Sequence, residues 1–228
     1  MSIKKCEAWT KYTIVPAVAI STVTLPLMAA IEKLAGFTTE ASINARKVAF
    51  FLGLGGYYSL LAKGRDYSQK KFKPTNIKLH DRLYFGMCGL LSLPAIYLPA
   101  KYISQQMGIT PPDFWSHTTT TAFSAGVGIF AGNMIGYSID IFRDLTGIKK
   151  SERKLPPPYI KNAKQPIKHM IAASLFSSSI ILMAGIYSFS DKIRDYMKEI
   201  NSRTYNEKNS LEERINNPQS ELENILKK

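Results

Sequence analysis

The sequence is poor in the residues that mark metal centres, disulfide frameworks and most enzymes. It has two cysteines and three histidines in 228 residues. Cys6 precedes the first apolar run and Cys88 lies inside a later one, so we expect no disulfide framework. The histidines are scattered and show no metal-ligand spacing. Because a Gly-x-Ser-x-Gly motif, a P-loop and a dinucleotide fingerprint are also missing, we expect neither an enzyme nor a bound cofactor or metal.

Long apolar runs are abundant, and they predict an all-α protein of the membrane. A helix needs roughly 20 mostly apolar residues to cross a bilayer. The chain has five candidate runs: Thr13–Ile31, Val48–Ala62, Leu83–Ala100, Thr119–Phe142 and Met170–Phe189. The second is short and glycine-rich, and alone it would also suit a buried helix of a soluble protein. Its four neighbours favour a polytopic helical membrane protein with about five transmembrane helices.

The predicted organisation has four parts. They are a four-span membrane domain (1–150), a basic, proline-rich cytoplasmic linker (151–168), a fifth transmembrane helix (169–190) and a polar, partly helical tail (191–228). We expect the linker to be stiff and extended. The first run, which follows two lysines, also has the shape of a cleavable signal peptide. Its length and its two prolines favour a retained span.

Positive charge is distributed unequally between the loops. The net charge of +13 would suit an anionic partner. However, segments 63–82 and 149–168 carry seven basic residues each, whereas segment 104–117 has no lysine or arginine. The positive-inside rule then places the N-terminus and both basic segments in the cytoplasm and the C-terminal tail outside the inner membrane. Since topology accounts for the charge, the expected partner is the lipid bilayer and not nucleic acid.

The fourth run carries a stripe of small residues. Gly128, Gly132 and Gly136 follow one another at i, i+4 spacing and therefore share one side of a helix. Small residues at this spacing let a second helix approach closely. Since five helices hardly enclose a pathway by themselves, we expect a homo-oligomer assembled partly on this stripe.

Polar residues next to this stripe are candidates for function. Asn133 and Asp140 lie within the apolar run, where an ionisable group costs about 2.5–3.5 kcal/mol. Asp140 either takes part in transport or pairs with Arg143 at i+3, and Asn133 either bonds between helices or contacts a substrate. At the other side of the membrane, Glu32 ends the first span and Arg46 opens the second. They could hold the two ends of a zwitterion, or act as interfacial anchors.

Two spans end in a similar way. The second ends in GYYSLLAKGRD (56–66) and the fourth in GYSIDIFRD (136–144). Both contain Gly-Tyr, a serine and a terminal Arg-Asp pair, and both spans are predicted to run towards the cytoplasm. The pattern suggests two repeated helical hairpins, as found in some transporters.

Three passages resemble the small bacterial L-alanine exporter family. They are Ile31-Glu32 with GFTTEASINARK (36–47), Gly64-Arg65-Asp66, and GNMIGYSIDIFRD (132–144). The resemblance covers residues 1 to about 150 and the family's four-span plan. The chain departs from the family where FLGLG replaces a Pro-x-Asn motif and where Ala-Lys-Gly replaces Tyr-Gly before Arg-Asp. The fifth span and the tail have no counterpart in the family.

The resemblance implies an exporter of a small neutral amino acid such as alanine. The positions that match family-like positions are Glu32, Arg46, Arg65, Asp66, Tyr137, Asp140 and Arg143. In this hypothesis Asp140 or Glu32 accepts a proton and couples export to the proton gradient, and Arg46 or Arg65 attracts the substrate carboxylate. The alternative is a membrane interaction or assembly protein that does not transport, in which the glycines and basic loops serve helix packing and partner docking.

Overall fold

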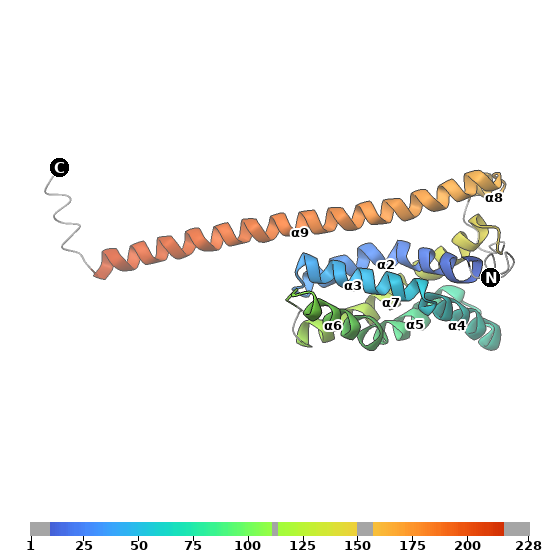
Figure 1. Ribbon diagram of the computed structural model, residues 1–228, viewed down its shortest axis with the longest axis horizontal. Helices are drawn as coiled ribbons and strands as arrows, with labels where there is room; N and C mark the ends of the chain where they lie inside the picture. The colour runs from blue at the N-terminus through green and yellow to red at the C-terminus, as the bar shows by residue number, and fades with distance from the viewer. Residues whose placement is uncertain (1–9, 111–113, 150–156, 217–228) are drawn as a thin grey trace. The chain divides into compact units, whose positions relative to one another are not determined.

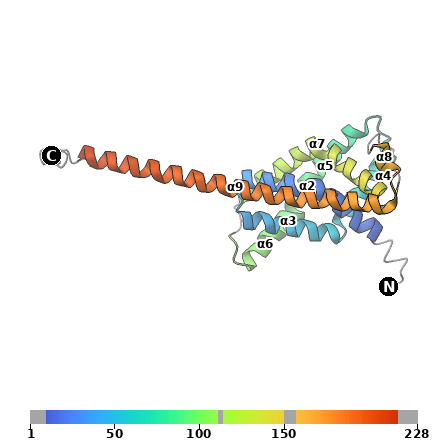
Figure 2. The same ribbon diagram turned by 90° about the horizontal axis from the view of Figure 1, so that it is seen from above.

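The computed structural model describes residues 10–110, 114–149 and 157–216, and every regular element in these ranges is helical. The chain divides into two compact units, Met1–Tyr187 and Ser188–Lys228. The described residues of the second unit belong to one long helix. The first unit is a bundle of helices, which Figures 1 and 2 show from two directions. The all-α expectation is thus confirmed for the described part of the chain.

Three helices of the described chain are long and apolar enough to cross a membrane. They comprise residues Lys11–Leu34, His117–Leu145 and Gln165–Ile193. A fourth candidate span consists of Ile77–Leu90 and Leu93–Gln106 together, if this bent pair crosses as one unit. The structure therefore supports a membrane protein with three to four candidate spans, where the sequence predicted five.

The first apolar run forms a π-helical turn, η1 (Thr10–Ile14), and then α2 (Val15–Leu34). Pro16 stands in the first turn of α2, where its missing N–H leaves no helical bond unmade. The buried side of the helix includes small residues such as Ala17 and Ala29, which are fully buried. These small side chains let α2 lie close to its neighbours.

The second apolar run does not form a single helix. It is shared between α3 (Thr39–Leu54) and α4 (Tyr57–Phe72). The break lies at Gly55 and Gly56, and Gly56 has a φ of +113°. A residue with a Cβ atom rarely adopts this positive φ, so a glycine is needed at position 56. The prediction of one continuous span over this run is therefore wrong.

The third apolar run is bent. It forms α5 (Ile77–Leu90), the π-helical turn η2 (Leu93–Tyr97) and α6 (Leu98–Gln106). The bend between the two halves is 46°. Pro94, which has no N–H to donate, stands at the start of the second half. Tyr97 follows the bend and is fully buried in the bundle.

The fourth run forms α7 (Phe114–Leu145), and its glycine stripe packs against α5. A Cβ atom at Gly132 would lie 2.6 Å from a backbone oxygen of α5, and one at Gly128 would overlap the α5 backbone. A Cβ atom at Gly136 would overlap a carboxylate of α5. The stripe is thus occupied within the chain. A homo-oligomer assembled on this stripe does not fit this packing, because α5 already fills the surface.

The remaining described elements are α8 (Pro158–Lys161) and α9 (Gln165–Asn216). The predicted extended linker therefore contains a helical turn and the start of a long helix, while residues 150–156 lie outside the described ranges. Helix α9 continues without a break from the predicted fifth span into the predicted tail. Residues 217–228 also lie outside the described part.

Helices α2 and α7 run in opposite directions along the bundle. The Ser138 hydroxyl of α7 donates to the carbonyl oxygen of Ala19 at 2.8 Å, and the Ser124 hydroxyl lies 3.7 Å from the sulfur of Met28. We call the end of the bundle where α2 ends the neutral end. The opposite end, where α7 ends and α4 carries its lysines, is called the basic end.

Candidate functional site: two buried ion-pair clusters

A cluster of buried polar side chains lies at the neutral end of the bundle. The Glu32 cluster consists of Glu32, Ser42, Arg46, Tyr97 and Tyr187, contributed by α2, α3, η2 and α9. The Glu32 carboxylate accepts hydrogen bonds from the Ser42 hydroxyl at 2.5 Å and the Tyr97 hydroxyl at 3.0 Å, and forms an ion pair with Arg46. The hydroxyls of Ser42 and Tyr187 are hydrogen-bonded at 2.9 Å.

This geometry limits what Glu32 and Arg46 can do. Their residues are 0% and 4% exposed. An interfacial anchor must place its charge in water, so burial contradicts the anchor interpretation of these two residues. Their charges are directed at each other and at Tyr97, whose hydroxyl also accepts from Arg46 at 3.2 Å.

A second buried cluster lies at the basic end. The Arg65 cluster consists of Arg65 and Gln69 of α4, Asp81 of α5 and Asp140 of α7. Arg65 donates to both oxygens of Asp81 at 2.8 and 3.0 Å, and to both oxygens of Asp140 at 2.9 Å. Gln69 adds a bond to Asp81 at 2.9 Å. One guanidinium thus joins three helices through two bidentate pairs, the strongest geometry for a carboxylate and an arginine.

The two carboxylates of this cluster differ in their access to water. Asp81 is 0% exposed, whereas the Asp140 side chain is 22% exposed. Gly136 makes room for the pair, since a Cβ atom there would lie 3.2 Å from the Arg65 Nε and would overlap the Asp81 carboxylate. The last glycine of the stripe therefore has a second role. The missing side chain at Gly136 of α7 leaves space for the buried ion pair between Arg65 of α4 and Asp81 of α5.

The two similar span endings pair with each other. Arg65 of the first ending bonds to Asp140 of the second. Conversely, Arg143 of the second ending lies 2.9 Å from a carboxylate oxygen of Asp66 in the first. Asp66 has a side-chain exposure of 43%, so this outer pair is close to solvent. The sequence predicted that Asp140 either takes part in transport or pairs with Arg143 at i+3; the structure pairs Asp140 with Arg65 of another helix and Arg143 with Asp66.

The two clusters lie at opposite ends of the same helix pair. Ala19 of α2 lies level with Ser138 of α7, two residues from Asp140. Glu32 stands 13 residues further along α2, which corresponds to roughly 20 Å at 1.5 Å per residue. Between these levels α2 and α7 are packed through largely apolar side chains, including Ile20, and through a few serines. Charge is therefore concentrated at two separated levels of the bundle.

Two further predicted residues lie near the Arg65 cluster on α7. Asn133 and Tyr137 stand on α7 within two turns of Asp140, and both are partly buried. Their roles as substrate or coupling residues stay predictions. In the described ranges, no group of three or more His, Cys, Asp or Glu side chains is arranged to hold a metal ion.

Sequence reasoning missed five members of the clusters: Ser42, Gln69, Asp81, Tyr97 and Tyr187. The charge pattern predicts Asp81 within the basic segment 63–82, but Asn76 caps the start of α5 before it, since its side-chain oxygen accepts the N–H of Leu79 at 3.1 Å. An asparagine cap before an apolar periodic segment is a recognisable helix start, and it would have placed Asp81 in a helix. Ser42 and the two tyrosines carry no comparable signal, because hydroxyl residues are common in apolar helices.

Comparison of the chain with protein-family models, curated protein sequences and solved structures finds no match. The resemblance to the alanine exporter family therefore rests on the short motifs alone.

Proposed function

We propose that the chain is a small transporter of the inner membrane that exports a small amino acid, with the two clusters as gates at opposite ends of the pathway. The observation that carries this proposal is the placement of two buried ion-pair clusters at the two ends of one helix bundle. In the proposed cycle one cluster opens while the other stays closed, as alternating access requires.

The energetics of buried charges support a gating role. Replacing a buried ion pair with apolar residues is often neutral or stabilising, whereas removing one partner costs about 3–5 kcal/mol. Such a pair therefore adds little to the stability of the fold, but a conformation that leaves one of its two charges buried and unpaired is strongly disfavoured. A proton or a substrate charge can supply the missing partner and make a second arrangement accessible. Ionisable residues inside membrane proteins frequently serve this purpose.

The proposed coupling uses the carboxylates as proton acceptors. At the neutral end, protonation of Glu32 removes its negative charge and releases Arg46 to hold a substrate carboxylate. At the basic end, Asp140 is the more accessible carboxylate, and its protonation would leave Arg65 bound to Asp81. A proton that enters at the neutral end and leaves at the basic end then accompanies one amino acid moving outwards.

The proposed topology has five passes, with the N-terminus in the cytoplasm and the C-terminus outside. Helices α3 and α4 are separately too short to span, but together they connect the two ends of the bundle. Ser42 of α3 belongs to the Glu32 cluster, while Ser59 of α4 donates at 2.6 Å to the carbonyl oxygen of Tyr12, before the start of α2. This course supports a broken second span. The substrate, alanine or another small neutral amino acid, follows from the family resemblance.

Efflux of amino acids from cells tests the proposal. Cells that lack their own exporters are loaded with an alanine dipeptide, and the release of free amino acid is followed with and without the chain. The native protein should accelerate release, and Glu32→Gln and Asp140→Asn should abolish the acceleration. Glu40→Gln is the matched control, because Glu40 is exposed in the first turn of α3 and should leave export unchanged.

A second readout separates loss of coupling from loss of folding. Exchange of labelled alanine across proteoliposomes needs no proton gradient, so Asp140→Asn should retain exchange if its role is to carry the proton. Equal export by the native chain, Glu32→Gln and Asp140→Asn, at matched membrane levels, would contradict the gating mechanism. An absence of release for every amino acid tested would refute transport itself.

The second candidate is an interaction or assembly protein that does not transport. The observation that favours it is the continuation of α9 from its apolar part, Gln165–Ile193, to Asn216. A helix of this kind offers a second unit for a partner to bind. Truncation after Ile193, where the apolar part of α9 ends, discriminates between the two functions, since it should abolish capture of a partner but leave export by the bundle intact.

A further inference from the structure

An apolar groove lies on the surface of the bundle at the break between α3 and α4. It has a volume of about 780 Å³. Its floor is formed at Gly55 and Gly56, where the absence of side chains leaves the surface hollow. Its apolar walls come from α3, α4 and α6, and include Leu52, Leu60 and Ile103. These three side chains are 37%, 69% and 38% exposed, which is unfavourable in water but suitable for contact with a lipid chain.

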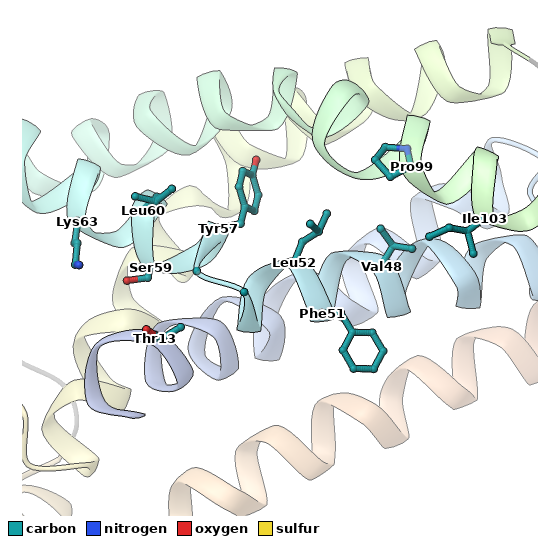
Figure 3. Close-up of a pocket in the computed structure, with 12 residues that line it drawn as sticks. Thr13, Val48, Phe51, Leu52, Tyr57, Ser59, Leu60, Lys63, Pro99 and Ile103 are labelled. Carbon is teal, nitrogen blue, oxygen red and sulfur yellow. The ribbon is translucent and has the colours of Figure 1, made fainter. Parts of the chain in front are cut away.

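The groove has a polar end and an apolar end. Figure 3 shows Lys63, Ser59 and Thr13 gathered at one side of it, and Val48 and the α6 residues at the other. Among the described residues that line the groove, Lys63 is the charged one. Lys63 is exposed, and no ion pair engages it within the described chain. The Thr13 hydroxyl adds a group that can donate a hydrogen bond at this end of the groove, whereas the Ser59 hydroxyl already donates to the carbonyl oxygen of Tyr12.

The groove is long enough for the acyl chain of one leaflet. Val48 of α3 and Lys63 of α4 are 15 residues apart in two helices that meet at the glycine break, which corresponds to roughly 20 Å of helical rise. One leaflet contributes about 15 Å to the hydrocarbon core. An amphiphile with its charged group at Lys63 would therefore have room for an acyl chain along Leu52 towards Val48.

We propose that this groove binds one anionic phospholipid, with its phosphate at Lys63 and an acyl chain along the break between α3 and α4. Charge complementarity selects the occupant: the charged end is cationic, and the remaining walls are apolar. The polar end also lies at the basic end of the bundle, because Ser59 bonds to Tyr12 there. If the basic end faces the cytoplasm, the site opens to the leaflet in which anionic lipids attract basic segments. The inference does not depend on transport.

Native mass spectrometry of the purified full-length protein tests the site. The protein in detergent is titrated with dioleoyl phosphatidylglycerol or with dioleoyl phosphatidylcholine, and the occupancy of the first bound lipid is measured. We expect a preference of about fivefold or more for phosphatidylglycerol, the effect of one lysine near an anionic surface. Lys63→Gln should remove the preference while phosphatidylcholine still binds.

Two further variants make the test specific. Gly55→Leu should lower the occupancy by both lipids, because it fills the floor at a residue whose φ of −69° permits a side chain. Lys78→Gln removes an exposed lysine of α5 that does not line the groove and should change nothing. Glycerol 3-phosphate, which has no acyl chain, should not compete at lipid concentrations that saturate the site.

Three outcomes would overturn the proposal. Equal losses of phosphatidylglycerol in Lys63→Gln and Lys78→Gln would mean diffuse attraction and not a site. Unchanged occupancy in Gly55→Leu would place the bound lipid elsewhere. A dimer in the native spectrum that disappears in Gly55→Leu would make a second copy of the chain the occupant of the groove.

Discussion

Replacement of Arg65 by methionine should cost the bundle about 3–5 kcal/mol of unfolding free energy, the usual penalty for removing one partner of a buried ion pair. The loss falls mainly on Asp81, which is 0% exposed and would keep its hydrogen bond from Gln69 and its contact with His80 at 3.5 Å. Arg65 supplies two charge-assisted bonds to Asp81, each worth roughly 1.5–3 kcal/mol. Asp140 should suffer less, because its side chain is 22% exposed and can be hydrated.

A double-mutant cycle tests this reasoning. Arg65→Met, Asp81→Leu and the double variant are unfolded in mixed micelles under identical conditions, and their free energies are compared. The double variant should be more stable than Arg65→Met, because it leaves no buried charge at position 81. A cost of Arg65→Met below about 1 kcal/mol, or single effects that simply add, would contradict a penalty for leaving Asp81 buried and unpaired.

Three further predictions concern stability in the same detergent. Gly132→Leu should lower the unfolding free energy by about 1–3 kcal/mol through overpacking against α5. The control Gly126→Leu should not lower it, because a Cβ atom at Gly126 meets no described atom within 4 Å. Equal losses in the two variants would contradict the packing of α5 on the stripe. Tyr187→Phe should cost about 1 kcal/mol by removing the hydrogen bond to Ser42, and an unchanged melting temperature would count against the role of α9 in the Glu32 cluster. Asp66→Asn should cost less than about 1 kcal/mol, because its pair with an arginine is close to solvent; a loss as large as that of Arg65→Met would show that exposure does not decide the cost.

The sequence was sufficient to predict the class of the fold. Apolar runs of about 20 residues indicated helices that cross a membrane, and three of the five were recovered as long continuous helices. Composition could not locate the breaks. The run 48–62 is apolar throughout its first half, but Gly56 takes a positive φ and divides it. The run 83–100 is bent at the residues before Pro94.

Several components of the site were also visible in the sequence. Charged residues within or beside apolar runs are costly, so Glu32, Arg46 and Asp140 stood out by position, whereas Arg65 became a candidate through the family resemblance. Their pairing could not be derived in this way. The sequence placed Glu32 and Arg46 near the same vestibule, but it could not show that both are buried and bonded to each other.

The sequence by itself determined the helical class, the uneven distribution of charge and the identity of most costly residues, because these depend on local composition and periodicity. Tertiary structure alone decided which charges meet. Arg65 lies 16 residues from Asp81 and 75 from Asp140, and the three side chains come together only because α5 packs on the glycines of α7. The stripe at Gly128, Gly132 and Gly136 could equally have served contacts between copies of the chain. The close approach of α5 fills it instead, and so directs the buried charges towards one another.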